Sequence, residues 1–177
     1  MKVERLALPE LLLITPDVHE DARGYFMETY QRDRYVAAGI LEMFVQHNVS
    51  MSHRGVIRGL HAQRAPHAQA KLVTVLHGRV FDVAVDVRED SPRFGQWVGV
   101  ELDDVRHQQL YIPPGFLHGF QALKDGTVLG YSVSAPYNRE AEYGVRWDDE
   151  TIGIRWLDIS AQLVARDEQL PRLSKHK

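Results

Sequence analysis

The sequence contains no cysteine, and this absence excludes several kinds of chemistry at once. Without thiols there is no disulfide framework, no thiolate nucleophile and no cysteine metal site. The absence fits a cytoplasmic protein. The segment from Met1 to Leu13 places charged residues before a short apolar stretch and offers no small-residue cleavage site. We therefore expect no signal peptide and a cytoplasmic location.

Long apolar runs and a basic excess are also missing. No run approaches the roughly 20 apolar residues of a membrane span. The 21 Lys and Arg residues against 24 Asp and Glu residues give a formal net charge of −3, whereas nucleic-acid binders usually carry a basic excess. We expect neither a membrane nor a nucleic-acid partner. Repeats and linkers are absent too, so the 177 residues predict a single domain over 1–177.

Short strand patterns dominate what is present. Apolar and polar residues alternate between glycine and proline turns, which predicts an all-β sandwich or barrel with few helices. One helix is expected over 31–41, ended by Gly39. Trp147 and Trp156 suggest a packed C-terminal return. The expected strands cover 3–14, 25–30, 44–50, 71–76, 79–88, 96–102, 109–112, 118–123 and 127–135.

The clearest strand pattern flanks His77-Gly78 and predicts a hairpin with a two-residue turn. In that register Val73 pairs with Asp82, and Lys71 lies diagonal to Asp82 on a face that is otherwise apolar. The Lys–Asp pair is either a structural ion pair or a cation held inside a cavity by its counter-ion. The pattern leaves both interpretations open.

The stretch from Arg58 to His61 carries the densest chemistry. It offers a cation that suits a phosphate, a flexible joint at Gly59 and a base that titrates near neutral pH. Gln46 and Asn48 share one face of the preceding strand. They either belong to a half-exposed strand or exchange hydrogen bonds with a ligand.

Pro113 to His118 follows a Pro-x-Gly-x-x-His pattern that resembles the second motif of cupin barrels. In metal cupins this histidine joins a His-x-His and a glutamate from an earlier strand. Here that segment is His61-Ala62-Gln63, without the second histidine and without a nearby glutamate. Because a metal needs three or four placed ligands, we expect a cupin-like barrel that works by acid–base chemistry. A metal cupin oxygenase and a non-catalytic binding module are the rivals from other classes.

Taken in order, the motifs resemble those of the dTDP-4-dehydrorhamnose 3,5-epimerase family nearly end to end. The matching stretches are Asp21-x-Arg-Gly-x-Phe-x-Glu28, Val45-Gln46-x-Asn48-x-Ser50-x-Ser52, Gly55 to His61 with Gln63, Pro66 to Val73, Gly78 to Arg88, Ser91 to Gly95, Ile112 to Phe120, Tyr131, Tyr137, Glu142, Trp147 to Asp149, Ile154-x-Trp156 and Asp167.

The resemblance implies a cupin-like double-stranded β-helix, or jelly roll, with a dTDP-linked 4-keto-6-deoxyhexose as substrate. Protons at C3 and C5 are acidic because they lie next to the C4 ketone, so epimerisation needs a base, an enolate stabiliser and an opposing acid. The ketone is the electron sink, so no cofactor is implied. The implied catalytic residues are His61 as base, Asp167 as its orienting partner, Lys71 as oxyanion stabiliser, Asp82 as counter-ion and Tyr131 as acid.

The resemblance also implies a nucleotide site. The family takes the segment Arg23 to Glu28 from the neighbouring subunit, which implies an obligate homodimer. The residues alone leave open that Phe26 is a core side chain and Arg23 a surface cation. The implied binding residues are Arg23 and Arg58 for phosphates, Phe26 for stacking on thymine, Glu28, Gln46 and Asn48 for its polar edge, His118 in the lining of the catalytic pocket and Tyr137 near the substrate.

Four positions depart from the family pattern: His47, Ser132, Pro136 and Arg166. None removes an implied catalytic group. Ser132 and Pro136 adjoin Tyr131 and Tyr137, near the place where protons return. The activity expected is inversion at both C3 and C5 on the route to dTDP-L-rhamnose, with a single-carbon epimerase of a related sugar as the alternative.

Overall fold

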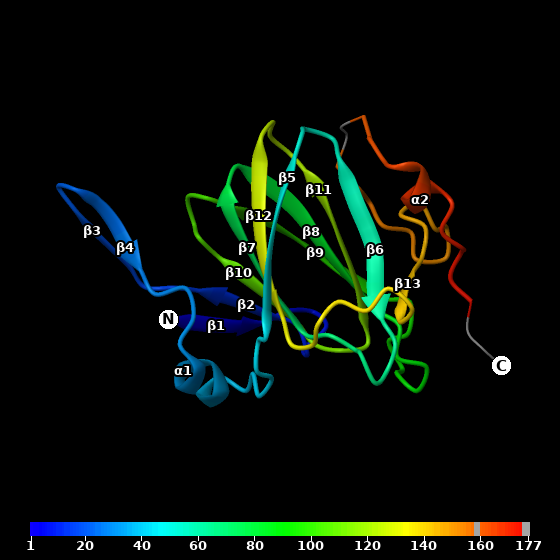
Figure 1. Ribbon diagram of the computed structural model, residues 1–177, viewed down its shortest axis with the longest axis horizontal. Coiled ribbons are helices and arrows are strands. Elements are labelled where there is room, and N and C mark those ends of the chain that lie inside the picture. Colours follow the sequence, from blue (N-terminus) through cyan, green and yellow to red (C-terminus); the bar gives the residue numbers. More distant parts are fainter. Residues whose placement is uncertain (158–159, 175–177) are drawn as a thin grey trace.

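The computed structural model describes residues 1–157 and 160–174, whose strands build two large antiparallel sheets (Figure 1). The six-stranded sheet has the order β1 (Lys2–Arg5), β2 (Leu12–Thr15), β10 (Gln109–Ile112), β7 (Lys71–His77), β12 (Thr127–Val133) and β5 (Gln46–Ser52). The five-stranded sheet has the order β13 (Glu142–Gly144), β6 (Ile57–Gln63), β11 (Phe116–Ala122), β8 (Arg79–Asp86) and β9 (Trp97–Asp103). This is a jelly-roll barrel, so the expected all-β, cupin-like fold is confirmed.

A hairpin and two short helices complete the described part of the chain. The hairpin of β3 (Val18–Asp21) and β4 (Gly24–Met27) projects away from the barrel (Figure 1). The expected first helix is present but shorter, as α1 (Arg32–Ala37), and the other helix is α2 (Ala165–Glu168). No helix in the described residues is long and apolar enough to cross a membrane.

The main core lies between the two sheets. Successive strand residues point to opposite faces, so every second side chain enters the barrel. The buried side chains that meet there come from both sheets, and they include Val73, Val75, Leu110, Ile112 and Leu129 from one and Val80, Ala84, Leu102, Phe116 and Phe120 from the other. This apolar filling leaves the polar inward residues grouped at one place, where the candidate site forms.

The predicted hairpin across His77-Gly78 is wrong. β7 pairs with β10 and β12, whereas β8 pairs with β11 and β9, so the chain changes sheets between them. Gly78 lies at this crossing with φ +88°, and a Cβ there would lie 2.5 Å from Thr127 Oγ1. Both strands are central and apolar on both faces, and each finds its partners elsewhere in the sequence.

The two faces assigned to these strands nevertheless hold. Inward residues of opposing sheets share one interior, just as residues on one face of a hairpin would. Lys71 and Asp82 therefore still act on each other electrostatically, now across the barrel.

The C-terminal return packs on the outer face of the five-stranded sheet, as expected from its tryptophans. The ring centroids of Trp147 and Trp156 are 6.5 Å apart, and Trp156 joins a cluster with Val83 and Leu117. Beyond it, Gln162 exchanges backbone hydrogen bonds with Ile57 and Gly55 at the start of β6. This docking brings α2 beside β6.

Candidate active site

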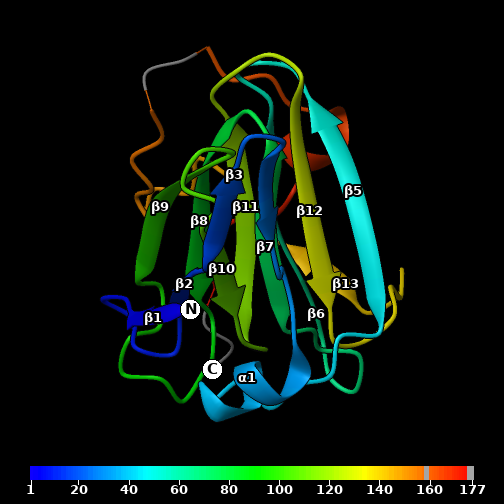
Figure 2. The same ribbon diagram turned by 90° about the vertical axis from the view of Figure 1, so that its left-hand side faces the viewer.

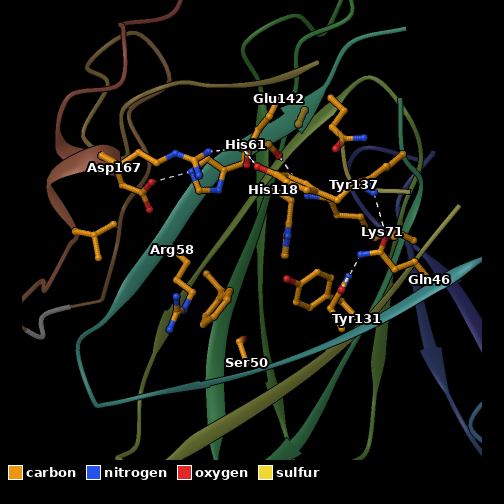
Figure 3. A pocket seen from close by; sticks show the side chains of 18 residues that line it. Gln46, Ser50, Arg58, His61, Lys71, His118, Tyr131, Tyr137, Glu142 and Asp167 are labelled. Carbon is orange, nitrogen blue, oxygen red and sulfur yellow. Dashed lines mark hydrogen bonds and ion pairs between the residues drawn. The ribbon is translucent and has the colours of Figure 1, made fainter. Parts of the chain in front are cut away.

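A cavity of about 460 Å³ opens between the two sheets, beside α2 (Figure 3). Most of its lining side chains are polar, unlike the rest of the barrel interior. Nine of the predicted site residues line it, namely Gln46, Asn48, Arg58, His61, Lys71, His118, Tyr131, Tyr137 and Asp167. The structure therefore brings together residues from seven separate elements or loops.

Two facing glycines set the spacing of β6 and β11 under the cavity. Gly59 has φ +127°, and a Cβ on it would lie 2.6 Å from the Cα of Gly119. A Cβ on Gly119 would lie 2.8 Å from the carbonyl oxygen of Arg58. Gly59 thus serves close packing of two strands. Beside this contact, His61 and His118 pair across the two strands.

His61 is oriented by Asp167. Its Nε2 lies 2.8 Å from Oδ1 of Asp167, while Oδ2 accepts a hydrogen bond of 3.3 Å from the Gly59 N–H. Burial acts to raise the pKa of the Asp167 carboxyl, but the contacts with His61 and Gly59 and the charge of Arg166 outweigh it, so the pKa is lowered. The carboxylate is therefore ionised near neutral pH. With Nε2 engaged, Nδ1 is the imidazole nitrogen left to accept a proton.

Asp82 is hydrogen-bonded to His118. The His118 Nε2 lies 3.0 and 3.1 Å from the two carboxylate oxygens, and the Asp82 residue is 0% exposed. Asp82 was predicted as the counter-ion of Lys71, and its charge does act to raise the pKa of Lys71. Its hydrogen-bond partner, however, is His118.

Lys71 is the half-buried cation of the cavity. Its Nζ donates a long hydrogen bond of 3.4 Å to the carbonyl oxygen of His61. Burial lowers the pKa of Lys71 to about 8, although the charges of Asp82 and Glu142 act to raise it. An ammonium with this pKa is still mostly protonated at neutral pH, and it is weakly solvated. It is suited to stabilise a nearby oxyanion.

Tyr131 enters the cavity from the sheet opposite His61. It lies on β12 of the six-stranded sheet, whereas His61 lies on β6 of the five-stranded sheet, and both side chains point into the space between (Figure 3). Burial raises the pKa of the Tyr131 hydroxyl. The hydroxyl therefore stays protonated as a proton donor, and a ring bound between the two residues would meet a base and an acid on opposite faces.

The remaining polar residues form the wall toward β5. Gln46 donates a 2.8 Å hydrogen bond to Asn48 through Nε2 and accepts one of 3.0 Å from the Tyr137 N–H. Arg58 donates to Ser52 Oγ at 3.1 Å and to the Met51 carbonyl at 3.0 Å. These bonds hold the side chains in place. That Gln46 and Asn48 read a ligand stays a prediction.

Three predicted binding residues lie outside this cavity. Arg23 is paired with Asp21 at 2.6 Å on the projecting hairpin, with its side chain 90% exposed. Glu28 is paired with Arg34 at 2.9 Å. Phe26 is 71% exposed, so it is not a core residue. Within one chain, these residues do not reach the pocket.

Glu142 and Arg166 belong to the cavity wall, and the sequence did not assign them a role in the site. Glu142 Oε2 accepts a 2.8 Å hydrogen bond from the Tyr137 hydroxyl and forms an ion pair with Arg166. No spacing signal links them, because they come from β13 and α2. Two hints were present in the sequence, without a role: Glu142 matches the family pattern, and Arg166 departs from it.

Gln63 occupies the position where a metal cupin has its second histidine. Its Nε2 donates to the carbonyls of His67 at 2.7 Å and Pro136 at 3.2 Å, and its Oε1 accepts 2.7 Å from the Asn138 N–H. This amide ties together the loop that carries Tyr137. In residues 1–157 and 160–174, no group of three or more histidine or acidic side chains is arranged to hold a metal.

Comparison with known proteins identifies the family in which this fold and site occur. The family described as dTDP-4-dehydrorhamnose 3,5-epimerase matches residues 5–175. The chain belongs to this family. The Salmonella typhimurium member is 43% identical over 177 residues, covering 99% of this chain and 97% of its own.

Solved structures of family members agree closely. The epimerase from Bacillus anthracis, with TDP and pyrophosphate bound, has a TM-score of 0.94 at 41% identity and covers 97% of this chain and 99% of its own. The one from Legionella pneumophila, in complex with dTDP-4-keto-L-rhamnose, has a TM-score of 0.91 at 40% identity and covers 98% of both chains. A 3'-monoepimerase from Streptomyces bikiniensis, in complex with dTDP-quinovose, has a TM-score of 0.89 at 35% identity and covers 94% of this chain and 85% of its own.

Proposed function

We propose that this protein is an isomerase that inverts C3 and C5 of dTDP-4-dehydro-6-deoxy-glucose to give dTDP-4-dehydro-L-rhamnose, on the route to dTDP-L-rhamnose. One observation carries the proposal: the His61–Asp167 pair and Tyr131 face each other from opposite sheets with Lys71 in the same cavity. Base, oxyanion stabiliser and acid are the three groups that this reaction needs.

The chemistry at each carbon is a proton exchange. His61 Nδ1 removes the proton next to the ketone, and the C–H electron pair moves into an enolate whose C4 oxygen is stabilised by the Lys71 ammonium. Tyr131 then gives its hydroxyl proton to the opposite face of the carbon. The proton on His61 passes to solvent, and the Tyr131 phenolate takes a proton from solvent, so both groups are restored. The ketone accepts and returns the electron pair, so no cofactor takes part.

Asp167 and the Asp82–His118 pair support this exchange. Asp167 holds the His61 ring and stabilises the imidazolium that forms during proton removal. His118 lines the sugar space, and its partner Asp82 adds a negative charge that favours the protonated form of Lys71. Asp167 therefore favours the imidazolium form of His61, and Asp82 favours the ammonium form of Lys71.

The nucleotide site is completed by a second copy of the chain. β5 is one of the two edge strands of the six-stranded sheet (Figure 2), and an open edge favours association. Val49 and Met51 on β5 and Leu76 on β7 are exposed, as is Phe26 on the hairpin. These features support a homodimer in which the segment from Arg23 to Glu28 reaches the partner's pocket. Arg58 then meets the phosphates, and Gln46 and Asn48 meet the base.

Mixing two inactive variants tests this shared site. Arg23→Ala and His61→Ala subunits, refolded together at equal amounts, give half hybrid dimers if pairing is random. Each hybrid holds one intact site if the hairpin serves the partner, so activity returns to about a quarter of wild type. No recovery would assign Arg23 to its own subunit's site. A cytoplasmic, single-domain protein remains our expectation.

A single-carbon epimerase is the second candidate. Ser132 and Pro136 lie beside Tyr131 and Tyr137, and the family likeness extends to a 3'-monoepimerase. Incubation with the keto-sugar in deuterated water separates the two. Deuterium at both C3 and C5 supports the proposed function, deuterium at one carbon supports the alternative, and no incorporation refutes both.

A further inference from the structure

Four residues from separate parts of the chain form one connected network at the cavity rim, which we call the rim network: Gln46, Tyr137, Glu142 and Arg166. Figure 3 shows the first three of them. Gln46 Oε1 on β5 accepts from the Tyr137 N–H at 3.0 Å. The Tyr137 hydroxyl donates to Glu142 Oε2 at 2.8 Å, and Arg166 on α2 pairs with the same oxygen. The network therefore runs from the edge of one sheet to the helix beside the other.

Tyr137 depends on these bonds for its position. It is 52% exposed and follows β12 in a loop, so the barrel core does not fix its ring. The bonds at its backbone N–H and at its hydroxyl fix both ends of the residue. The ring is thereby held at the rim of the cavity that contains His61, Lys71 and Tyr131.

Glu142 depends in turn on Arg166. The Glu142 side chain is only 15% exposed, and a largely buried carboxylate requires a cation and hydrogen-bond donors. Arg166 supplies the cation from outside, where its own side chain is 57% exposed. Glu142 also acts electrostatically on Lys71 and Tyr131, so its place matters to both.

We propose that Arg166 is a positioning residue: through Glu142 it holds Tyr137 across the exit of the cavity and keeps the sugar bound between its two proton exchanges. This inference rests on the proposed two-carbon epimerisation, in which a singly inverted sugar must stay bound, or return, for the second exchange. Loosening Tyr137 opens the exit and favours early release. Arg166 thus influences how much product is inverted at one carbon only.

The experiment measures deuterium position in product sampled at low conversion. Wild type, Arg166→Gln and Arg166→Lys are compared in deuterated water with the keto-sugar substrate. In Arg166→Gln we expect the ratio of singly to doubly exchanged sugar to rise about two- to five-fold, the scale expected from losing one partly exposed ion pair. Arg166→Lys keeps the charge and restores the wild-type ratio.

Tyr137→Phe keeps the test independent of folding. It removes only an exposed hydroxyl, so the protein retains its core, and it should raise the same ratio without touching Arg166. An unchanged ratio in both variants overturns the inference. So does a tenfold weaker affinity for dTDP in Arg166→Gln with an unchanged ratio, which would make Arg166 a nucleotide contact.

The result for the wild-type protein distinguishes a failure of the role proposed for Arg166 from a failure of the proposed two-carbon epimerisation. Two deuterons in wild type, with an unchanged ratio in the variants, overturn the role of Arg166 and leave the epimerase intact. A single deuteron in wild type overturns two-carbon epimerisation, and the inference falls with it.

Discussion

His61 Nε2 lies 2.8 Å from Oδ1 of Asp167, although the two residues are 106 positions apart in the sequence. The contact forms because the C-terminal segment docks beside β6. It fixes which imidazole nitrogen is left for the substrate, and it holds Asp167 ionised. The two consequences belong together, since an imidazole that gains a proton during the reaction needs a negative partner on its other side.

Asp167→Asn should therefore lower kcat by about 10²-fold or more, because the amide no longer stabilises the imidazolium. Binding of dTDP, measured by calorimetry, should stay near wild type, since His61 keeps its place on β6. Glu168→Gln on the same helix, where the side chain is exposed, is the matched control and should leave kcat unchanged. Equal losses in the two variants would mean that the helix as a whole, and not the carboxylate, was disturbed.

The pKa of Lys71, lowered by burial to about 8, predicts the alkaline limb of the pH profile. Below this pH the ammonium is present and stabilises the oxyanion. As pH rises through about 8 the charge is lost, so kcat/KM falls. Arg keeps its charge at high pH, so Lys71→Arg should move the limb upward even if the maximal rate is reduced. A limb at the same pH in Lys71→Arg would assign it to another group.

The buried pair of Asp82 and His118 predicts a large stability effect. His118→Leu leaves the Asp82 carboxylate buried without its partner and should cost about 3–5 kcal/mol in urea unfolding. Adding Asp82→Asn removes the stranded charge and should recover part of that loss. The exposed pair of His53 and Asp125 is a matched comparison, and His53→Leu should produce no measurable change. A similar loss at both sites would mean that burial does not decide the cost.

Replacing Phe26 should weaken the binding of dTDP without changing the stability of the fold. Because its side chain is exposed, Phe26→Ala should leave the melting temperature unchanged. If the ring stacks on the base in a neighbouring subunit, dTDP should bind about tenfold more weakly, within the range of one base–aromatic stack. Val105→Ala, also at an exposed apolar side chain, should change neither quantity. Unaltered dTDP affinity in Phe26→Ala would remove the hairpin from the nucleotide site.

Local alternation in the sequence was enough to predict most strands and the fold class. It could not predict pairing across Gly78, because two central strands that are apolar on both faces look the same whether they pair with each other or with distant partners. The sequence still showed that Lys71 and Asp82 share the inward face of these strands. Alternate residues of a strand point inward whichever strands it pairs with.

The site divides along similar lines. Chemistry near Arg58 to His61 was evident from residue type, but no pattern within the sequence connects His61 with Asp167. That link came from the family resemblance. Glu142 and Arg166 meet only through folding, and an ion pair between a short strand and a four-residue helix leaves no periodic trace.

The order of residues along the chain also determines when the C-terminal segment can dock during synthesis. All strands of the barrel, through β13, precede Asp167. During synthesis the strands that carry Lys71 and Tyr131 are therefore added to the chain before the carboxylate that orients His61. The base can gain its partner only after the residues of these strands have been joined.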